Sequence, residues 1–243
     1  MKIKFHRNLA GVFGYRLIRR RKMAHLLLPM HLQTLFEKHH INCVIDVGAH
    51  TGEYAAQLRT HGFGGEIFSF EPVASNFSTL SRKAEKDSKW HCLDCALGSE
   101  DAMQDINVAT DSVFTSFHTP NAYATQRFGV NKVTTSHVQS VQVRRLDGIL
   151  RNLVRAIPEP RVFLKMDTQG YDLEVFKGAQ GVLDLIFGLQ SEASVQPIYE
   201  NMPGHMETIQ KYREKGYEIT GMYPISRDHG TLKLIEFDCV MVR

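Results

Sequence analysis

Apolar and polar positions alternate along the chain in blocks that predict strands followed by helices. In the first clear block, residues 43–47, four apolar or β-branched residues surround a single acid, Asp46. A short apolar run of this kind is typical of a parallel strand buried on both faces. Gly48 and Gly52 follow and bracket a turn tight enough to enter a helix at once. The pattern therefore predicts a strand, a glycine turn and a helix.

The same rhythm continues to the C-terminus. Further strands are predicted at Ile67–Phe70, Trp90–Leu97, Val162–Asp167, Ile186–Ser191, Tyr217–Met222 and Leu234–Val242. Helical spacing predicts helices at 52–59, 74–86, 172–177 and 206–215. This alternation favours an α/β fold with a doubly wound, mostly parallel, seven-stranded sheet. Helices cover both faces, and the two closing strands form an antiparallel pair.

Residues 99–145 interrupt this rhythm and read as an insertion. Short strands are predicted at Met103–Ala109, Phe114–His118 and Val138–Arg145, joined by polar, Thr- and Asn-rich sequence. The insertion is expected near the carboxyl ends of the parallel strands, where ligands bind. Two interpretations stay open, namely a wall over an acceptor site and a solvent-exposed antiparallel flap.

Residues 1–40 are predicted to form a basic, helical extension in front of one domain at 41–243. Leu28, Leu32 and Leu35 keep helical spacing, which favours a helix packed on that domain. The apolar stretch is too short and interrupted for a membrane span or a signal peptide. A basic run precedes it, and a solvated helix face is the favoured interpretation over weak contact of residues 16–30 with an anionic membrane surface. The basic residues are Arg16, Arg19, Arg20, Arg21 and Lys22.

Composition narrows the class of protein further. With 243 residues and 43% hydrophobic content, the chain can bury one sizeable core. The net charge of +3 does not imply nucleic acid, and no aromatic–basic interleaving predicts a stacking surface. Four cysteines without framework spacing suit a reducing, cytoplasmic location. Cys92 and Cys95, three apart in a predicted strand, point to opposite faces, so no redox pair is expected.

The glycine turn and a second acid predict a nucleoside-binding half-site. A strand–turn–helix unit presents backbone N–H groups and a helix N-terminus to a ligand. Glu71, nineteen residues after Gly52, ends the next predicted strand. An acid at that place can accept hydrogen bonds from ribose hydroxyls.

The turn sequence selects among nucleoside cofactors. A dinucleotide site requires G-x-G-x-x-G, whereas this turn reads G-A-H-T-G with His50 in the middle. No Lys-Ser/Thr pair follows, which excludes a P-loop. Asp46 would repel a pyrophosphate but suits the cationic amino group of a methionine moiety. S-adenosylmethionine therefore fits better than NAD.

Several motifs in order resemble those of the FkbM-type methyltransferases. The most specific runs from Leu164 to Ala179 and reads LKMDTQGYDLEVFKGA. The others are VIDVGAHTG at 44–52, Phe70-Glu71-Pro72 with Asn76-Phe77, Ala96-Leu97-Gly98 and Arg145-Leu146-Asp147. The resemblance implies the class I Rossmann-like fold and methyl transfer to a hydroxyl of a saccharide or natural-product-like acceptor.

The resemblance also implies a set of cofactor contacts. These are Asp46, Gly48 and Glu71, with adenine packed near Cys95 and Ala96, and Asn76 supporting the Glu71 turn. His50 and Gly52 belong to the same turn and are included as cofactor-binding candidates. The chain departs from the family at Gln169, where a glutamate is usual, and at Tyr171-Asp172, which replace a small residue and a glutamate.

Methyl transfer to an alcohol is helped by a base that removes the hydroxyl proton during attack. Asp167, at the tip of its predicted strand, is the first candidate for this catalytic role. Lys165, two residues earlier on the same strand face, is expected to pair with it or to hold an anionic acceptor. A purely structural ion pair is an equally good interpretation. His50, His118 and His137 are weaker candidates among twelve histidines.

Other sites and functions were weighed against this hypothesis. Asp167 and Glu192 would end adjacent strands, but two acids without a clear third ligand do not predict a metal site. The rival functions are a nicotinamide-dependent oxidoreductase and a non-catalytic cofactor-binding scaffold. The absence of the Asn/Asp-Pro-Pro-Tyr/Phe signature argues against a nucleic-acid amino-methyltransferase and leaves a small-molecule or glycan acceptor as the expected partner. No sequence signal indicates an oligomeric state.

Overall fold

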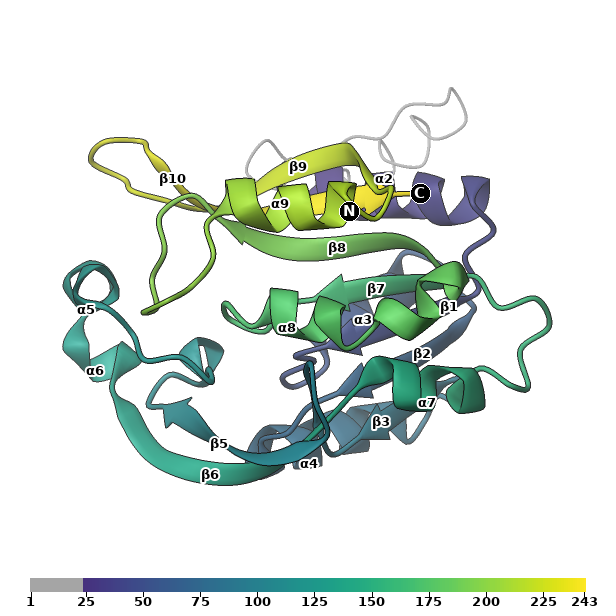
Figure 1. Cartoon of the computed structure of the whole chain (residues 1–243), viewed down its shortest axis with the longest axis horizontal. Helices are drawn as coiled ribbons and strands as arrows, with labels where there is room; N and C mark the ends of the chain where they lie inside the picture. The colour runs from purple at the N-terminus through teal and green to yellow at the C-terminus, as the bar shows by residue number, and fades with distance from the viewer. Residues whose placement is uncertain (1–23) are drawn as a thin grey trace, which may run out of the picture.

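The computed structural model describes residues 24–243 and contains a twisted seven-stranded sheet with helices on both faces (Figure 1). The strand order is β3-β2-β1-β7-β8-β10-β9. These strands are β1 (Cys43–Val47), β2 (Glu66–Phe70), β3 (Trp90–Leu93), β7 (Val162–Met166), β8 (Ile186–Ser194), β9 (Glu218–Arg227) and β10 (Leu234–Val242).

The register of the sheet brings the predicted site to its centre. β1 pairs in parallel with β2 on one side and with β7 on the other. β8 continues the parallel order, and β10 is antiparallel to both β8 and β9. The predicted fold class, mostly parallel with a reversed strand near the end of the chain, is confirmed. Strand order reverses direction between β1 and β7, which is where α/β sheets bind ligands.

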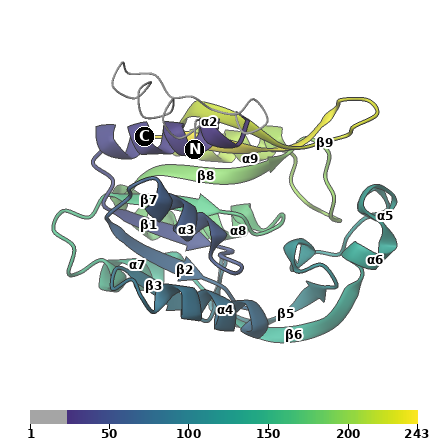
Figure 2. The same cartoon turned by 180° about the vertical axis from the view of Figure 1, so that it is seen from behind.

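Two groups of helices cover the sheet, one on each face. Figure 2 shows the side that carries α2 (Ala24–Lys38), α3 (Glu53–Thr60) and α4 (Ala74–Ala84). The opposite face carries α7 (Leu146–Leu153), α8 (Asp172–Lys177), the 3-10 helix η3 (Gln180–Leu185) and α9 (His205–Arg213).

Period-two alternation along each strand divides the core into two apolar layers. Val44 and Phe163 point to the layer under α2, α3 and α4. Ile45 and Leu164, their neighbours in the chain, point to the layer under α7, α8 and α9. Both layers are made of fully buried side chains, as expected when helices cover a parallel sheet on both sides.

A smaller sheet, in the order β4-β6-β5, is built from the insertion and corrects one strand prediction. Its strands are β4 (Ala96–Leu97), β5 (Ala102–Ala109) and β6 (Thr135–Arg144). The prediction of a single strand at Trp90–Leu97 was wrong. Only Trp90–Leu93 pair with β2, whereas Ala96–Leu97 pair with β6.

The strand predicted at Phe114–His118 was also wrong. The segment begins with a 3-10 helix, η2 (Ser112–Phe114), and makes only one isolated bridge, between Ser116 and Asn107. The Ser116 hydroxyl donates to the Gln169 carbonyl at 2.7 Å, so this segment is tied to the loop after β7 rather than to a strand. Two short helices, α5 (Ala122–Phe128) and α6 (Val130–Val133), follow it.

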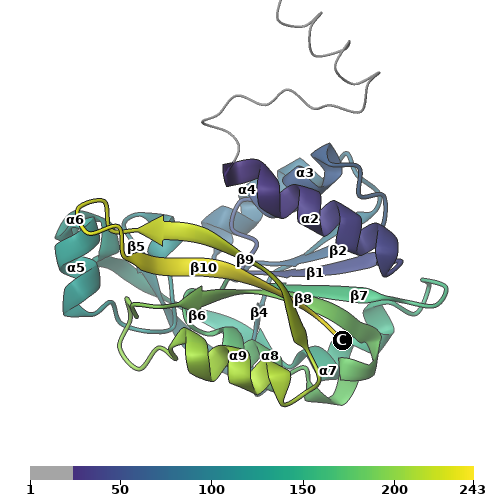
Figure 3. The same ribbon diagram turned by 90° about the horizontal axis from the view of Figure 1, so that it is seen from above.

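Two arms project from the same end of the molecule (Figure 3). One is the β5–β6 arm with α5 and α6, and the other is the β9–β10 hairpin. They touch where Arg127 donates to the Arg227 carbonyl at 3.0 Å and approaches Asp228 at 3.9 Å. The cavity described below lies at the carboxyl ends of the central strands, with Ile106 of one arm and Ile225 of the other in its wall.

The predicted helix before β1 corresponds to α2, and Leu32, Leu35 and Phe36 bury themselves against the sheet. The predicted basic run at residues 16–22 lies outside the described residues, so the proposed membrane contact stays a prediction. Between residues 24 and 243, no helix is both long and apolar enough to cross a bilayer.

Candidate cofactor and acceptor site

The glycine turn after β1 has the strained backbone that its sequence requires. Gly48 and Gly52 have φ of 71° and 89°, a region that L-residues with side chains rarely adopt. A Cβ at Gly48 would collide with the backbone carbonyl oxygen of Asp167. His50 also has positive φ, at 50°. The turn is therefore pressed directly against the carboxyl end of β7.

Glu71 anchors the other side of this turn. One of its oxygens accepts from the His50 backbone N–H at 2.8 Å. The other accepts from the Val73 N–H at 3.0 Å and from the Asn76 side-chain amide at 3.4 Å. Burial raises the pKa of Glu71 to about 7, against the lowering effect of these donors. The predicted support of the Glu71 turn by Asn76 is thus present as a hydrogen bond.

Asp46 and Lys165 form a buried ion pair behind the turn. Their side chains lie opposite each other on β1 and β7, with Lys165 Nζ 3.0 Å from Asp46 Oδ1. The Ser69 hydroxyl donates to the other Asp46 oxygen at 3.1 Å. Lys165 Nζ also donates to the Gly48 carbonyl at 3.2 Å. Burial opposes the charge on Lys165, but Asp46 and Asp167 raise its pKa above the usual value.

Asp167 is an acid at the tip of β7 that solvent can reach. Its side chain is 46% exposed, and Oδ2 lies 3.6 Å from Lys165 Nζ. The Gln169 side-chain amide donates to its other oxygen at 3.3 Å. Asp167 is therefore held from two sides and keeps open lone pairs toward the cavity.

Gln169 occupies the position where the family usually has a glutamate, and its surroundings explain the amide. Its Nε2 donates to Glu192 at 2.9 Å as well as to Asp167. Its Oε1 accepts from the Tyr199 hydroxyl at 3.0 Å. An amide can donate to two carboxylates, whereas a third carboxylate would have no proton to share with them. The backbone is strained here too, with φ of 53°.

We expect Gln169→Glu to destabilise the protein by about 1–3 kcal/mol at pH 8, because one part-buried and one exposed hydrogen bond to carboxylates become contacts between acids. For a chain of this size that is roughly 2–12 °C in melting temperature. The introduced acid will bind a proton more tightly when folded than when unfolded, so the loss should shrink as the pH falls toward 5.

Thermal unfolding at pH 8 and pH 5.5 measures this effect. Gln126→Glu, at an exposed position on α5, is the matched control and should leave both melting temperatures unchanged. Equal melting temperatures for wild type and Gln169→Glu at pH 8 would show that the amide is not needed.

One cavity of about 660 Å³ joins these elements. Gly48, His50 and Glu71 line one part of it, and Lys165 and Asp167 another. Its volume is within the range of small-molecule and cofactor sites. Its other walls include Asn76, Ala96 and Leu97, also Glu53, Tyr54, Gln169, Gln190, Glu192 and Asp238, and Ile106, Ser112, Val113, Thr115, Phe117, Tyr171 and Ile225.

The insertion thus forms a wall of this cavity rather than a free flap. Phe117 packs on Tyr171 with ring centroids 4.6 Å apart. The His50 ring bonds the Ser112 hydroxyl at 2.8 Å, which links the glycine turn to the insertion. Both contacts place insertion residues over the carboxyl ends of β1 and β7.

Not every predicted site residue reaches the cavity. Gly48, His50, Glu71, Ala96, Lys165 and Asp167 line it, whereas Asp46, Gly52 and Cys95 do not. Gly52 packs against Leu80 and Trp90, where a Cβ would clash with both side chains. The alternative bases His118 and His137 also lie outside the lining. The sequence drew attention to Glu192 only for a metal site that was then not predicted, and nothing in it marked Gln190 or Asp238.

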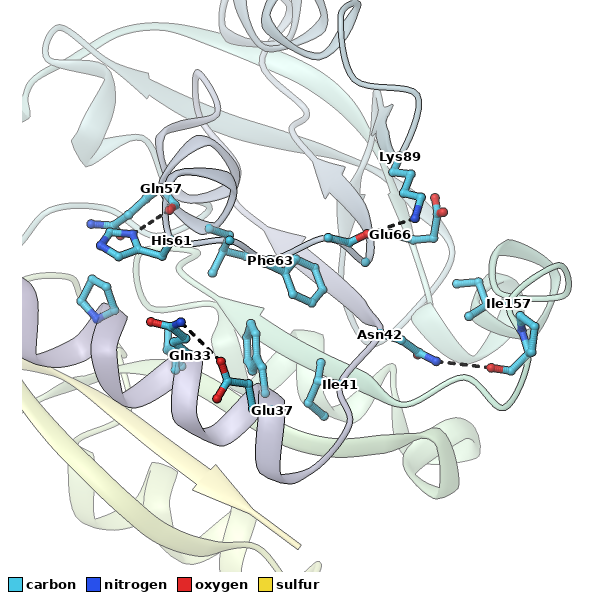
Figure 4. Close-up of a pocket in the computed structure, with 18 of the residues that line it drawn as sticks. Gln33, Glu37, Ile41, Asn42, Gln57, His61, Phe63, Glu66, Lys89 and Ile157 are labelled. Carbon is cyan, nitrogen blue, oxygen red and sulfur yellow. Dashed lines mark hydrogen bonds between the residues drawn. The ribbon is translucent and has the colours of Figure 1, made fainter. Parts of the chain in front are cut away.

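A second cavity of about 500 Å³ lies at the opposite end of the sheet, beside the amino ends of β1 and β2 (Figure 4). Phe63, Ile41 and Ile157 contribute apolar walls between α2 and the loop after α3. Gln33 and Glu37 bond each other on its α2 side at 3.3 Å. It shares Gln57 with the first cavity but holds none of the predicted site residues.

Among residues 24–243, no group of three or more His, Cys, Asp or Glu side chains is arranged to hold a metal ion. The residues that are present fit S-adenosylmethionine instead. The glycine turn allows close backbone approach, and Glu71 offers a carboxylate at the end of β2 for ribose hydroxyls.

The strand order, the glycine turn after β1 and the acid after β2 define a Rossmann-like methyltransferase of class I that uses S-adenosylmethionine. The family model described as "Methyltransferase FkbM domain" matches residues 46–219. The chain belongs to this FkbM family, as its motifs predicted.

Solved structures with similar folds are distant in sequence. An rRNA methylase from Streptococcus thermophilus is 12% identical, with 93% of this chain and 98% of that chain covered and a TM-score of 0.45. Fibrillarin from Aeropyrum pernix, with natively bound S-adenosylmethionine, is 10% identical, with 83% and 66% covered and a TM-score of 0.45. Neither similarity bears on the acceptor. No curated protein sequence matches the chain.

Proposed function

We propose that this methyltransferase methylates a hydroxyl group of a saccharide or natural-product-like acceptor and that Asp167 is the base. The observation that carries the proposal is the place of Asp167. It is a solvent-accessible carboxylate at the tip of β7, in the same cavity as the glycine turn and in contact with it through its backbone.

The chemistry follows from that position. S-adenosylmethionine supplies an electrophilic methyl group on a sulfonium. The cavity walls hold the acceptor so that its hydroxyl oxygen can attack in line, and positioning of this kind supplies much of the rate. Asp167 would accept the hydroxyl proton as the carbon–oxygen bond forms and the carbon–sulfur bond breaks, and the electron pair of the broken bond would leave with S-adenosylhomocysteine. The methyl ether is the product, and the proton remains on the Asp167 carboxyl until solvent removes it.

Lys165 acts in this proposal as a positioning residue. Its ammonium is buried, paired with Asp46 and bonded to the Gly48 carbonyl, so it holds the turn and Asp167 in one arrangement. A role for Lys165 in binding an anionic acceptor is not supported by these contacts, because its donors are already engaged.

The direct test is transfer of a labelled methyl group from S-adenosylmethionine to fractionated extract. Label should appear in a glycan or small-molecule fraction, in a linkage that is stable to base, as an ether is. Label that disappears after nuclease treatment would contradict the proposed acceptor class and the predicted absence of a nucleic-acid partner.

Asp167→Asn is expected to lower kcat by a factor of about 100 to 10,000, the usual contribution of a general base. S-adenosylhomocysteine binding should fall by no more than about tenfold, because the amide preserves the shape of the side chain. Turnover near the wild-type rate would show that another group is the base. Unchanged methyl transfer in Asp167→Ala, together with intact cofactor binding, is the outcome expected of the non-catalytic scaffold.

A further inference from the structure

Asp46 was expected from the sequence to contact the positive charge of the cofactor, but its own charge is already balanced by a lysine. Asp46 is fully buried, lies outside the cavity lining, and is paired with Lys165 at 3.0 Å. Its second oxygen accepts from Ser69. Asp46 therefore has no free face toward a ligand, and the positive charge of S-adenosylmethionine must be met elsewhere.

Three acids on β8 and β10 form a carboxylate cluster (Glu192, Glu236 and Asp238), of which only Glu192 and Asp238 reach the wall of the same cavity. Glu192 on β8 and Asp238 on β10 are cross-strand partners, so their side chains share one face of the sheet. Both line the cavity. Glu236 lies two residues from Asp238 on β10, on the same face.

This cluster lacks a matching cation among the described residues of the cavity. Lys165 is the single Lys or Arg in the cavity lining, and Asp46 already engages it. Gln190 donates to Asp238 at 2.9 Å, and Gln169 donates to Glu192. These amides satisfy lone pairs but bring no positive charge.

Burial and mutual repulsion raise the pKa values of the cluster. Burial, with the charges of Asp167 and Glu236, raises the pKa of Glu192 well above its usual value. Burial raises the pKa of Glu236 to about 7, and Asp167 adds to the effect. Burial raises the pKa of Asp238 to about 6. A nearby cation would favour the ionised forms of all of them.

Two buried polar atoms behind the cavity wall add to this polar environment. Glu236 is 5% exposed, and its Oε1 accepts no hydrogen bond. Ser194, directly opposite on β8, is also buried, and its hydroxyl has no partner either. Buried polar atoms in proteins are almost always paired, so these two unpaired atoms mark a polar region behind Glu192 and Asp238, although neither Glu236 nor Ser194 lines the cavity itself.

We propose that the carboxylate cluster is the subsite for the positive charge of S-adenosylmethionine, with Glu192 and Asp238 facing the ligand and Glu236 behind them. The shared chemistry is an organic cation, which the cofactor offers twice, as its α-ammonium and as its sulfonium. This assignment concerns the cofactor and not the acceptor. It can therefore be correct or wrong whatever the acceptor proves to be.

Three ligands with graded charge test the subsite by calorimetric titration. 5′-Methylthioadenosine has the nucleoside but neither cation, S-adenosylhomocysteine adds the amino-acid part, and sinefungin has a further amine near the place of the sulfonium. In Glu192→Gln, S-adenosylhomocysteine should bind about tenfold or more weakly and methylthioadenosine within twofold of wild type.

The comparison among ligands identifies the source of the charge. Equal losses for S-adenosylhomocysteine and sinefungin assign the α-ammonium to the cluster. A larger loss for sinefungin than for S-adenosylhomocysteine assigns the sulfonium to the cluster as well. Equal changes for all three ligands, or no change for any, would overturn the proposal, because the effect would then not follow the charge.

Two further variants control for folding and for overall charge. Glu236→Gln should give the same ranking with a smaller loss, which keeps the proposal testable if Glu192→Gln is unstable. Glu207→Gln removes an exposed acid on α9, on the other face of the sheet, and should bind all three ligands as wild type does. Thermal unfolding of each variant establishes that it is folded.

Discussion

Lys165→Met is expected to lower the free energy of unfolding by about 3–5 kcal/mol, the cost of leaving a buried charge without its partner. For a chain of this length the melting temperature should fall by roughly 6–20 °C. The substitution leaves the fully buried Asp46 without its ion-pair partner and removes the donor to the Gly48 carbonyl. Differential scanning calorimetry at pH 7.5 measures the change.

The double variant Lys165→Met/Asp46→Leu separates the charge from the packing. If the unpaired carboxylate causes the loss, the second substitution should restore much of the melting temperature, because apolar replacements of a buried ion pair are often close to neutral. Cofactor affinity should stay reduced in both variants, since the turn at Gly48 has lost its support. A double variant as unstable as the single one would indicate that Lys165 stabilises the fold by packing alone.

The sequence was sufficient for the central sheet because burial dictates its pattern. β1 and β7 are covered on both faces and are therefore continuous apolar runs with one internal polar residue each. The reversed β10 was recognised as part of a closing pair. The strand prediction at Phe114–His118 was wrong for a physical reason. This segment takes its shape from contacts with Gln169 and Tyr199, which are distant in sequence.

The candidate site also has residues that the sequence predicted and residues that it did not. Motif spacing was enough to place Gly48, Glu71 and Asp167 in one cavity, because the ends of adjacent parallel strands meet at one edge of the sheet. Whether an acid faces the ligand depends on its partner, and the pairing of Asp46 with Lys165 is set by the register of β1 and β7. Asp238 lies inside a strand near the end of the chain, where no motif marks it.

Four polar residues on adjacent strands lie side by side in a row across the sheet. Ser69, Asp46, Lys165 and Gln190 are register neighbours on four successive strands. The first three lie one residue before the carboxyl end of β2, β1 and β7, and Gln190 lies in the middle of the longer β8. Toward the amino ends the neighbours are apolar, such as Val44 and Phe163. This face of the sheet thus becomes polar toward the end where the cavity lies, and Lys165 and Gln190 of the row line that cavity. A single polar residue within an otherwise apolar strand is the sequence signal for this change from apolar to polar.

The Glu71 carboxylate should make nucleoside binding depend on pH. Burial raises its pKa to about 7, and it must be ionised to accept hydrogen bonds from both ribose hydroxyls. Binding therefore becomes coupled to loss of a proton below pH 7. The affinity for 5′-methylthioadenosine should be constant above pH 8 and should fall by up to about tenfold for each pH unit below 7.

Methylthioadenosine is the right ligand for this measurement because it lacks the charged groups that the carboxylate cluster is proposed to bind. The titration of Glu192, Glu236 and Asp238 then contributes little to the profile. Glu71→Gln should bind about 10 to 100 times more weakly at pH 8, since a charge-assisted acceptor is lost, and its affinity should not vary with pH. A pH dependence that persists in Glu71→Gln would mean that another group titrates against the ribose, and that Glu71 only holds the turn through His50 and Val73.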